Sequence, residues 1–291
     1  MTGRIRKDRV NPQRGSALLV VLWSTLLLAG LATVVAGTVR TDLASARHLI
    51  EEAQSRSRAQ AGVVHGALLL LAGVDPLIAD GTVVAFDDVE VRVDFTDECG
   101  KVDLNTGWGE LLGRLVDFHG GSAAAAILDW RDPDSSVAMG GAEDAQYRAA
   151  GRTHGARNGP LDSVAELQQI VGVDAGLMQA LRPDVTVDCL NAGIDPMAAS
   201  EAVLASIPGV GDDARATFLT ARQSFIAGGL RGASPDLPGG DRYIAASPGL
   251  AVEITATAQS QDRAISWRAI TWLTGDGGLP LLFRTWERND R

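Results

Sequence analysis

The chain has 291 residues, of which 46% are hydrophobic and 21% are charged, and this composition excludes wholesale disorder. Its length predicts a membrane element with one or two folded units. The formal net charge of −10 becomes −14 without residues 1–15, which carry five basic residues and one acidic residue. So acidic a chain argues against nucleic acid and anionic lipid headgroups as partners.

The first predicted element is an apolar helix that begins near Ser16. No residue from Gly15 to Val39 is charged, and a helix of that length spans a hydrocarbon core of about 30 Å. The basic residues before it predict a cytoplasmic N-terminus. The small residues best placed for cleavage precede the apolar run, whereas an ordinary secretory signal is cut after it. We therefore expect a cleaved leader over residues 1–15 and a transmembrane helix over 16–39. A plain signal anchor with an incidental Gly-Ser pair is the alternative.

This leader resembles those of the type IV pilin-like superfamily, which prepilin peptidase cuts after a Gly ahead of the apolar helix. The resemblance implies cleavage after Gly15 and N-methylation of Ser16. The fifth mature residue is usually Glu in that superfamily but is Val20 here. A carboxylate in an apolar bundle needs a cationic partner, which in pili is the terminal amine of the neighbouring subunit. The K-type minor pseudopilin of type II secretion is similar in lacking this acid, and it lies at the pseudopilus tip.

Beyond the membrane segment, apolar or small residues continue the helix to Leu71, and Gly73 with Asp75-Pro76 predicts its end. These residues recur at three- and four-residue steps and form one stripe: Leu43, Ala46, Ile50, Ala53, Ser57, Ala61, Val64, Leu68 and Leu71. We expect this stripe to pack against the sheet of a globular head. A coiled coil is the alternative.

Period-two segments then predict one antiparallel sheet, interrupted by a helical insertion. The strands are expected over residues 82–86, 89–95, 250–257, 264–273 and 279–286. The predicted fold class is α+β, with a long N-terminal helix packed on the sheet. Residues 40–102 and 233–291 would form the pilin-like head, and residues 103–232 the all-α insertion.

The insertion contains two related units, over residues 102–130 and 190–219, that are typical of helix-hairpin-helix (SAM-like) motifs. Such motifs often hold DNA phosphate on the amides of a glycine-rich turn. Here the turn at residues 208–211 leads into Asp212 and Asp213, which satisfy the helix N-terminus and would repel phosphate. We therefore favour a structural role and expect no nucleic acid as a partner. Ser163 and Glu166 form a capping box that opens a further helix.

The remaining candidates are a cysteine pair and an acidic loop. Cys99 and Cys189 are expected to form a disulfide after export, with two buried free thiols as the alternative. The four histidines are scattered and lack partners at motif spacing, so no enzymatic activity is expected.

Four carboxylates flank a glycine-rich loop: Asp132, Asp134, Glu143 and Asp144. Their hard oxygen ligands suit Ca²⁺. A solvated acidic loop explains the charge pattern equally well. Asp129 is a weaker candidate, expected to pair with Arg131 or to cap.

The order of motifs from the leader to about Thr220 resembles the K-type minor pseudopilin family. The matching motifs are residues 97–105, 127–132, 141–144 with Tyr147, 158–160 and 163–167. The resemblance implies Ca²⁺ bound by the four carboxylates. It also implies a single-pass inner-membrane protein with a periplasmic head that initiates and caps the pseudopilus. Its implied partners are the I- and J-type and major pseudopilins, prepilin peptidase, the inner-membrane secretion platform and membrane lipid. A type IV pilus minor pilin and a membrane-anchored DNA-uptake receptor are the alternatives.

Overall fold

The computed structural model describes residues 13–86, 89–230, 234–245, 251–259, 264–275 and 277–289, with side chains from Ser16 onward. The chain divides into two units, Met1–Gln54 and Ser55–Arg291. Helix α1 (Gln13–Leu71) begins in the first unit and ends in the second, which confirms the long predicted helix. The leader predicted over residues 1–15 lies outside the residues whose side chains are described.

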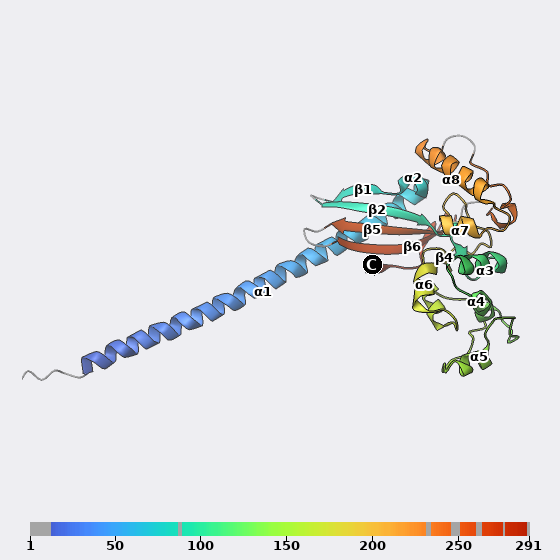
Figure 1. Ribbon diagram of the computed structural model, residues 1–291. Helices are drawn as coiled ribbons and strands as arrows, with labels where there is room; N and C mark the ends of the chain where they lie inside the picture. The colour runs from blue at the N-terminus through green and yellow to red at the C-terminus, as the bar shows by residue number, and fades with distance from the viewer. Residues whose placement is uncertain are drawn as a thin grey trace, which may run out of the picture. The chain divides into compact units, whose positions relative to one another are not determined.

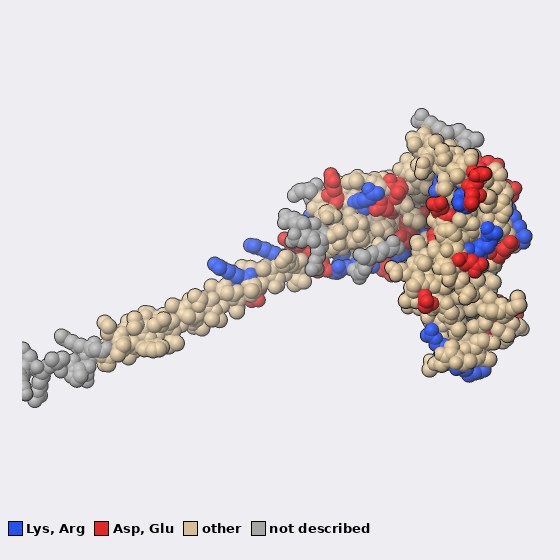
Figure 2. All heavy atoms as spheres, viewed as in Figure 1, with Lys and Arg blue, Asp and Glu red and all other residues tan. Residues whose placement is uncertain are grey.

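In the first unit, α1 carries the apolar run. Among the described residues it is the one helix that is long and apolar enough to cross a membrane, judged by length and composition. Figure 2 shows neither acidic nor basic side chains on the visible face of this stretch. The hydroxyls of Ser24, Thr33 and Thr38 donate to carbonyls three or four residues earlier, at 2.7, 2.7 and 2.9 Å. The helix therefore satisfies these polar groups internally, as an apolar environment requires.

The second unit is built on an antiparallel sheet in the order β1-β2-β5-β6-β7, and Figure 1 shows β1, β2, β5 and β6 side by side. Its strands are β1 (Thr82–Phe86), β2 (Val89–Asp97), β5 (Ala251–Gln259), β6 (Ala264–Leu273), β7 (Leu281–Phe283) and β8 (Glu287–Asn289). The prediction of one sheet split by an insertion is confirmed. The prediction of a single last strand over residues 279–286 was wrong, because two short strands, β7 and β8, both pair with β6. Between them the Thr285 hydroxyl, instead of a backbone carbonyl, accepts the Ile270 N–H at 2.8 Å.

Helix α1 packs on one face of this sheet through its small residues. The buried positions are Ser55, Ala59, Gly62, Val63, Gly66, Ala67 and Leu70. The predicted packing stripe was wrong, because its members Val64, Leu68 and Leu71 are 45%, 57% and 44% exposed. The helix has two apolar faces, and the sheet takes the face whose glycines and alanines permit the closer approach.

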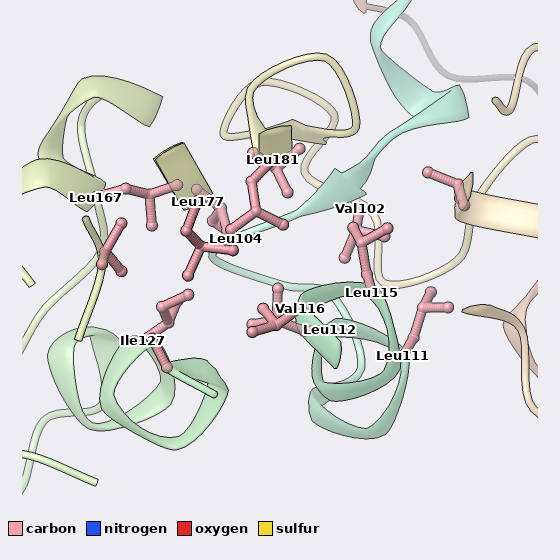
Figure 3. Close-up of a cluster of buried hydrophobic side chains, with 14 of the residues drawn as sticks. Val102, Leu104, Leu111, Leu112, Leu115, Val116, Ile127, Leu167, Leu177 and Leu181 are labelled. Carbon is pink, nitrogen blue, oxygen red and sulfur yellow. The ribbon is translucent and has the colours of Figure 1, made fainter. Parts of the chain in front are cut away.

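The helical insertion has its own core, which Figure 3 shows as a cluster of leucine, valine and isoleucine side chains. Its elements are η1 (Glu98–Gly100), β3 (Val102–Asp103), α3 (Gly109–Phe118), α4 (Ala124–Arg131), α5 (Asp144–Ala149), η2 (Val164–Gln169), α6 (Ala175–Leu181), β4 (Val185–Thr186), α7 (Glu201–Ser206) and α8 (Asp212–Ala227). A short α2 (Pro76–Ala79) precedes the sheet, and η3 (Asp241–Tyr243) follows the insertion. The capping box of Ser163 and Glu166 opens η2, a 3-10 helix. The parallel β3–β4 pair was not predicted, because two-residue strands have no detectable period.

The insertion is fastened to the sheet at one corner. A disulfide joins Cys99 of η1 to Cys189, which follows β4. Beside it the indole Nε1 of Trp272 in β6 donates to the Asp188 carbonyl at 2.9 Å. The Arg284 guanidinium lies 4.5 Å from the centre of the Trp272 ring and 3.5 Å from the Asp188 carboxylate. These contacts connect β6 and η1 to the chain that leaves β4.

Candidate functional site

The predicted metal ligands surround the loop between α4 and α5, and their environments differ. Glu143, the N-cap residue of α5, is 5% exposed, while Asp132 at the end of α4 is half-buried. Asp134 and Asp144 are exposed. Asp129, the weaker sequence candidate, is 1% exposed and is therefore the most deeply buried acid of this group.

Buried oxygen atoms without hydrogen-bond partners are concentrated at this loop. Among the described residues they include Oδ1 of Asp132, both carboxylate oxygens of Glu143 and Oδ1 of Asn158. Leaving a buried acceptor unpaired costs roughly 1–3 kcal/mol, and more when it is charged. Carboxylate and amide oxygens are also the donors that Ca²⁺ prefers. In chemistry and in lack of other partners, these atoms therefore suit a hard cation.

The electrostatics of the loop point the same way. Burial raises the pKa of Glu143, and the neighbouring charges of Asp129, Asp132, Asp134 and Asp144 raise it further. Burial also raises the pKa of Asp132, again with help from Asp134 and Asp129. Glu143 and Asp132 therefore resist ionisation because they are desolvated and because other carboxylates are near, and a bound cation would relieve this repulsion.

Two glycines let the chain close around the acids. An added Cβ at Gly141 would lie 2.0 Å from Oδ2 of Asp129, and one at Gly155 would lie 1.7 Å from Oδ1 of Asp144. Asp129 Oδ2 also accepts the Ala138 N–H at 3.1 Å. Even so, no three His, Cys, Asp or Glu side chains in the described part of the chain are arranged to hold a metal ion. The donors share the loop without forming a coordination shell.

Asp129 was expected to pair with Arg131 or to cap, but Asp129 and Arg131 each contact the backbone elsewhere. The Asp129 carboxylate holds the loop through Ala138, as described above. The Arg131 guanidinium donates to the carbonyls of Leu104 and Gly107 at 2.6 and 3.0 Å and thereby ties α4 to the segment before α3. Sequence spacing could not reveal the partners of Arg131, because these carbonyls lie more than twenty residues away.

The glycine-rich turn at residues 208–211 is covered by the chain itself. Gly209 and Gly239 face each other with φ of 87° in both. A Cβ added at Gly209 would lie 2.8 Å from the carbonyl oxygen of Gly239. A Cβ added at Gly239 would lie 2.4 Å from the carbonyl oxygen of Gly209. Leu237, beside this contact, is 1% exposed. The segment 237–240 thus lies where a phosphate would have to approach, and Asp212 after the turn pairs with Arg215 at 2.9 Å.

A serine, an aspartate and a histidine do meet in the insertion, in a structural arrangement. The Asp184 carboxylate accepts from the Ser200 hydroxyl at 2.6 Å and lies 2.8 Å from His119 Nε2. The serine therefore contacts the acid instead of the histidine, and its Oγ also accepts the Val203 N–H as the N-cap of α7. A nucleophilic serine needs a base on its hydroxyl. This group joins α3, α7 and the chain before β4.

The predicted processing residues lie at the start of α1. Gly15 directly precedes the residues whose side chains are described, and Ser16 is the first of these. Val20 is 64% exposed on the apolar helix.

Comparison with known proteins finds similarity to part of the insertion. A family model described as type II secretion system protein K matches residues 106–188. A type II secretion system protein K from Klebsiella pneumoniae is 43% identical over 61 residues, which are 21% of this chain. That match spans 19% of the relative's own length, about a fifth.

A solved structure is similar over most of the chain. It is the crystal structure of the GspK-GspI-GspJ complex from the enterotoxigenic Escherichia coli type 2 secretion system. The similarity has a TM-score of 0.55 at 16% identity and covers 82% of this chain and 100% of that chain. At this identity it shows the fold, and it confirms the predicted α+β class. The family model and the curated relative agree that part of this chain, within the insertion, is similar to type II secretion system protein K.

Proposed function

We propose that this protein is a minor pseudopilin at the tip of a type II secretion pseudopilus, where it initiates and caps assembly. Its role would be structural instead of enzymatic. The membrane-length half of α1 supports a single-pass anchor in the inner membrane with a periplasmic head. The match to the protein K family supports the choice of this machine over a type IV pilus.

The observation that carries the proposal is the exposed side of α1 in the second unit. We call it the outer stripe: Ser57, Ala61, Val64, Leu68 and Leu71. It contains three large apolar side chains that are 45%, 57% and 44% exposed at helical spacing. An apolar row of this kind marks a surface that another helix covers. In a filament, the helices of the subunits below would supply that cover.

Processing and incorporation provide the test. Mass spectrometry of the N-terminus should find N-methylated Ser16, whereas an intact Met1 or a cut near Gly37 would refute the leader assignment. A Leu68→Arg variant should be processed normally but should not co-purify with pseudopilus subunits. Leu190→Arg is the matched control, because Leu190 is also 57% exposed but lies outside α1. If both variants assemble like the parent protein, the outer stripe has no part in the filament.

The partners follow from the same proposal. The similar crystal structure is that of a complex of GspK with GspI and GspJ. We propose that this chain likewise binds I- and J-type minor pseudopilins, with the major pseudopilin beneath them. Prepilin peptidase, the inner-membrane platform and membrane lipid would be its other contacts. Val20 in place of an acid would leave no bond to the terminal amine of a neighbouring subunit.

Calcium is the proposed ligand of the acidic loop. Asp132, Asp134, Glu143 and Asp144 would hold it, with Asp129 fixing the loop through Ala138. The cation would neutralise the clustered carboxylates and stiffen the connection between α4 and α5. The Asp132→Ala, Glu143→Ala double variant should unfold at the same temperature in Ca²⁺ and in chelator, whereas the parent protein should be more stable in Ca²⁺. Glu90→Gln, at an exposed acid on β2, is the control and should keep the response to Ca²⁺. A parent protein that does not respond would refute the site.

A further inference from the structure

The loop between α4 and α5 presents a methionine at the corner of a tight turn. The Gly141 N–H donates to the Ala138 carbonyl at 2.9 Å, and Gly140 between them has a φ of 80°. This bond and this angle are those of a type II turn, in which Gly140 takes the third position and Met139 the second. The Met139 side chain is 101% exposed, so no other described group shields its thioether.

Both ends of this turn are fixed on a buried carboxylate. Asp129 is 1% exposed, and its Oδ2 accepts the Ala138 N–H at 3.1 Å. Gly141 lies against the same carboxylate, since an added Cβ there would lie 2.0 Å from Oδ2 of Asp129. The turn cannot fold over without losing these contacts. Met139 is therefore held in solvent by the backbone of the loop.

The other sulfur atoms of the described chain are shielded or already bonded. Cys99 and Cys189 form a disulfide, and no described cysteine is free. Met178 is 6% exposed in the core of the insertion, and Met197 is half-buried against the same core. Susceptibility of a sulfur atom to oxidation follows its exposure. Met139 is therefore the most accessible sulfur nucleophile in the part of the chain that the structure describes.

We propose that Met139 is a modification site, at which an uncharged peroxide oxidises the thioether to the sulfoxide. The sulfur donates an electron pair to one oxygen of hydrogen peroxide, and the O–O bond breaks as the S–O bond forms. The remaining oxygen leaves as water, so the sulfur loses two electrons and the peroxide gains them. An uncharged oxidant suits this surface, because acids of the same loop, Asp132, Asp134 and Glu143, would repel an anionic one.

Oxidation changes the surface of the loop and leaves its packing intact. The sulfoxide is polar, whereas the thioether is apolar. The tip formed by Met139 and Val137, which is 50% exposed, therefore loses much of its apolar character. The inference depends on the geometry of the turn and does not rest on the proposed function or on calcium.

The experiment treats the full chain in detergent with hydrogen peroxide and follows each methionine-containing peptide by mass spectrometry. The Met139 peptide should gain an oxygen atom at least about tenfold faster than the Met178 peptide, which corresponds to an opening free energy of at least about 1.4 kcal/mol at the buried site. Met139→Leu should abolish this early gain. Met178→Leu is the matched control and should leave the rate at Met139 as in the parent protein.

Thermal unfolding of protein oxidised at Met139 alone separates this surface site from damage to the core. Its midpoint should equal that of the untreated protein, because the exposed side chain supports no other group. Equal oxidation rates at Met139 and Met178, or earlier oxidation of Met197, would overturn the inference. A midpoint lowered by oxidation of Met139 alone would also overturn it, since the side chain would then be part of the packing.

Discussion

The close approach of α1 to the sheet predicts opposite effects for two glycine-to-alanine substitutions. At Gly62 the added methyl group would lie 2.7 Å from Val91 Cγ1 and 2.8 Å from Ala256 Cβ. Both distances are about 1 Å short of an ordinary contact between carbon atoms. Either α1 must move away from β2 and β5 or these side chains must shift. Overpacking of this kind costs about 1–3 kcal/mol.

The helix propensity of alanine offsets part of this cost, by up to about 1 kcal/mol. With the full offset, the net effect of Gly62→Ala is therefore a loss of up to about 2 kcal/mol. Gly113 in α3 is the matched control, because an added Cβ there meets nothing within 4 Å. Gly113→Ala should thus gain up to about 1 kcal/mol from propensity alone.

Thermal unfolding of the full chain in detergent, followed by near-ultraviolet circular dichroism, measures both effects. At about 2–4 °C per kcal/mol for a chain portion of this size, Gly62→Ala should lower the midpoint by up to roughly 8 °C. Gly113→Ala should raise it by up to about 4 °C. If Gly62→Ala proves as stable as Gly113→Ala, α1 does not lie against the sheet as described, and the assignment of its outer stripe fails with it.

Two further predictions concern the corner where the insertion meets the sheet. Replacing both Cys99 and Cys189 by serine should cost about 4 kcal/mol, because the disulfide closes a loop with a sequence separation of 90 residues. In chemical denaturation, the parent protein under reducing conditions should have the same midpoint as the double variant. A higher midpoint for the reduced parent protein would contradict the assignment of this cost to the disulfide. The second prediction concerns Asp97, whose pKa burial raises to about 7. The hydrogen bond from the Cys99 N–H lowers this pKa, and the nearby charges of Asp195, Glu98 and Asp75 raise it. Since the folded pKa lies above the ordinary value of 3.8, the folded state holds this proton more tightly, and stability should fall as pH rises from about 4 to about 7. Asp97→Asn keeps an acceptor for Cys99 and should flatten the dependence of the unfolding temperature on pH across this window. An unchanged slope would show that Asp97 is not the titrating group.

Local signals in the sequence were enough for the main elements. The uncharged run before Val39, the alternation in β2 and β6 and the box of Ser163 and Glu166 each depend on neighbours within a few residues. That the two groups of strands form one antiparallel sheet also followed from the sequence, whereas the order of the strands came from the structure.

What the sequence could not reveal depends on distant partners. The periodicity of α1 indicates two apolar faces but not which one the sheet selects, and that choice depends on glycines meeting Val91 and Ala256. The approach of Gly141 to Asp129 and of Gly155 to Asp144 is likewise a matter of loop geometry. At the acidic loop, residue types indicated a cation site, which stays a prediction, while the deep burial of Asp129 emerged only from the structure.

The link between Cys99 and Cys189 also bears on the order of events in the life of the protein. Thiols stay reduced in the cytoplasm, so a newly made chain leaves the ribosome without this covalent tie. If the head is translocated as proposed, the covalent tie between η1 and the chain after β4 would form only then. The insertion would thus gain this constraint on the side of the membrane where the proposed fibre is built.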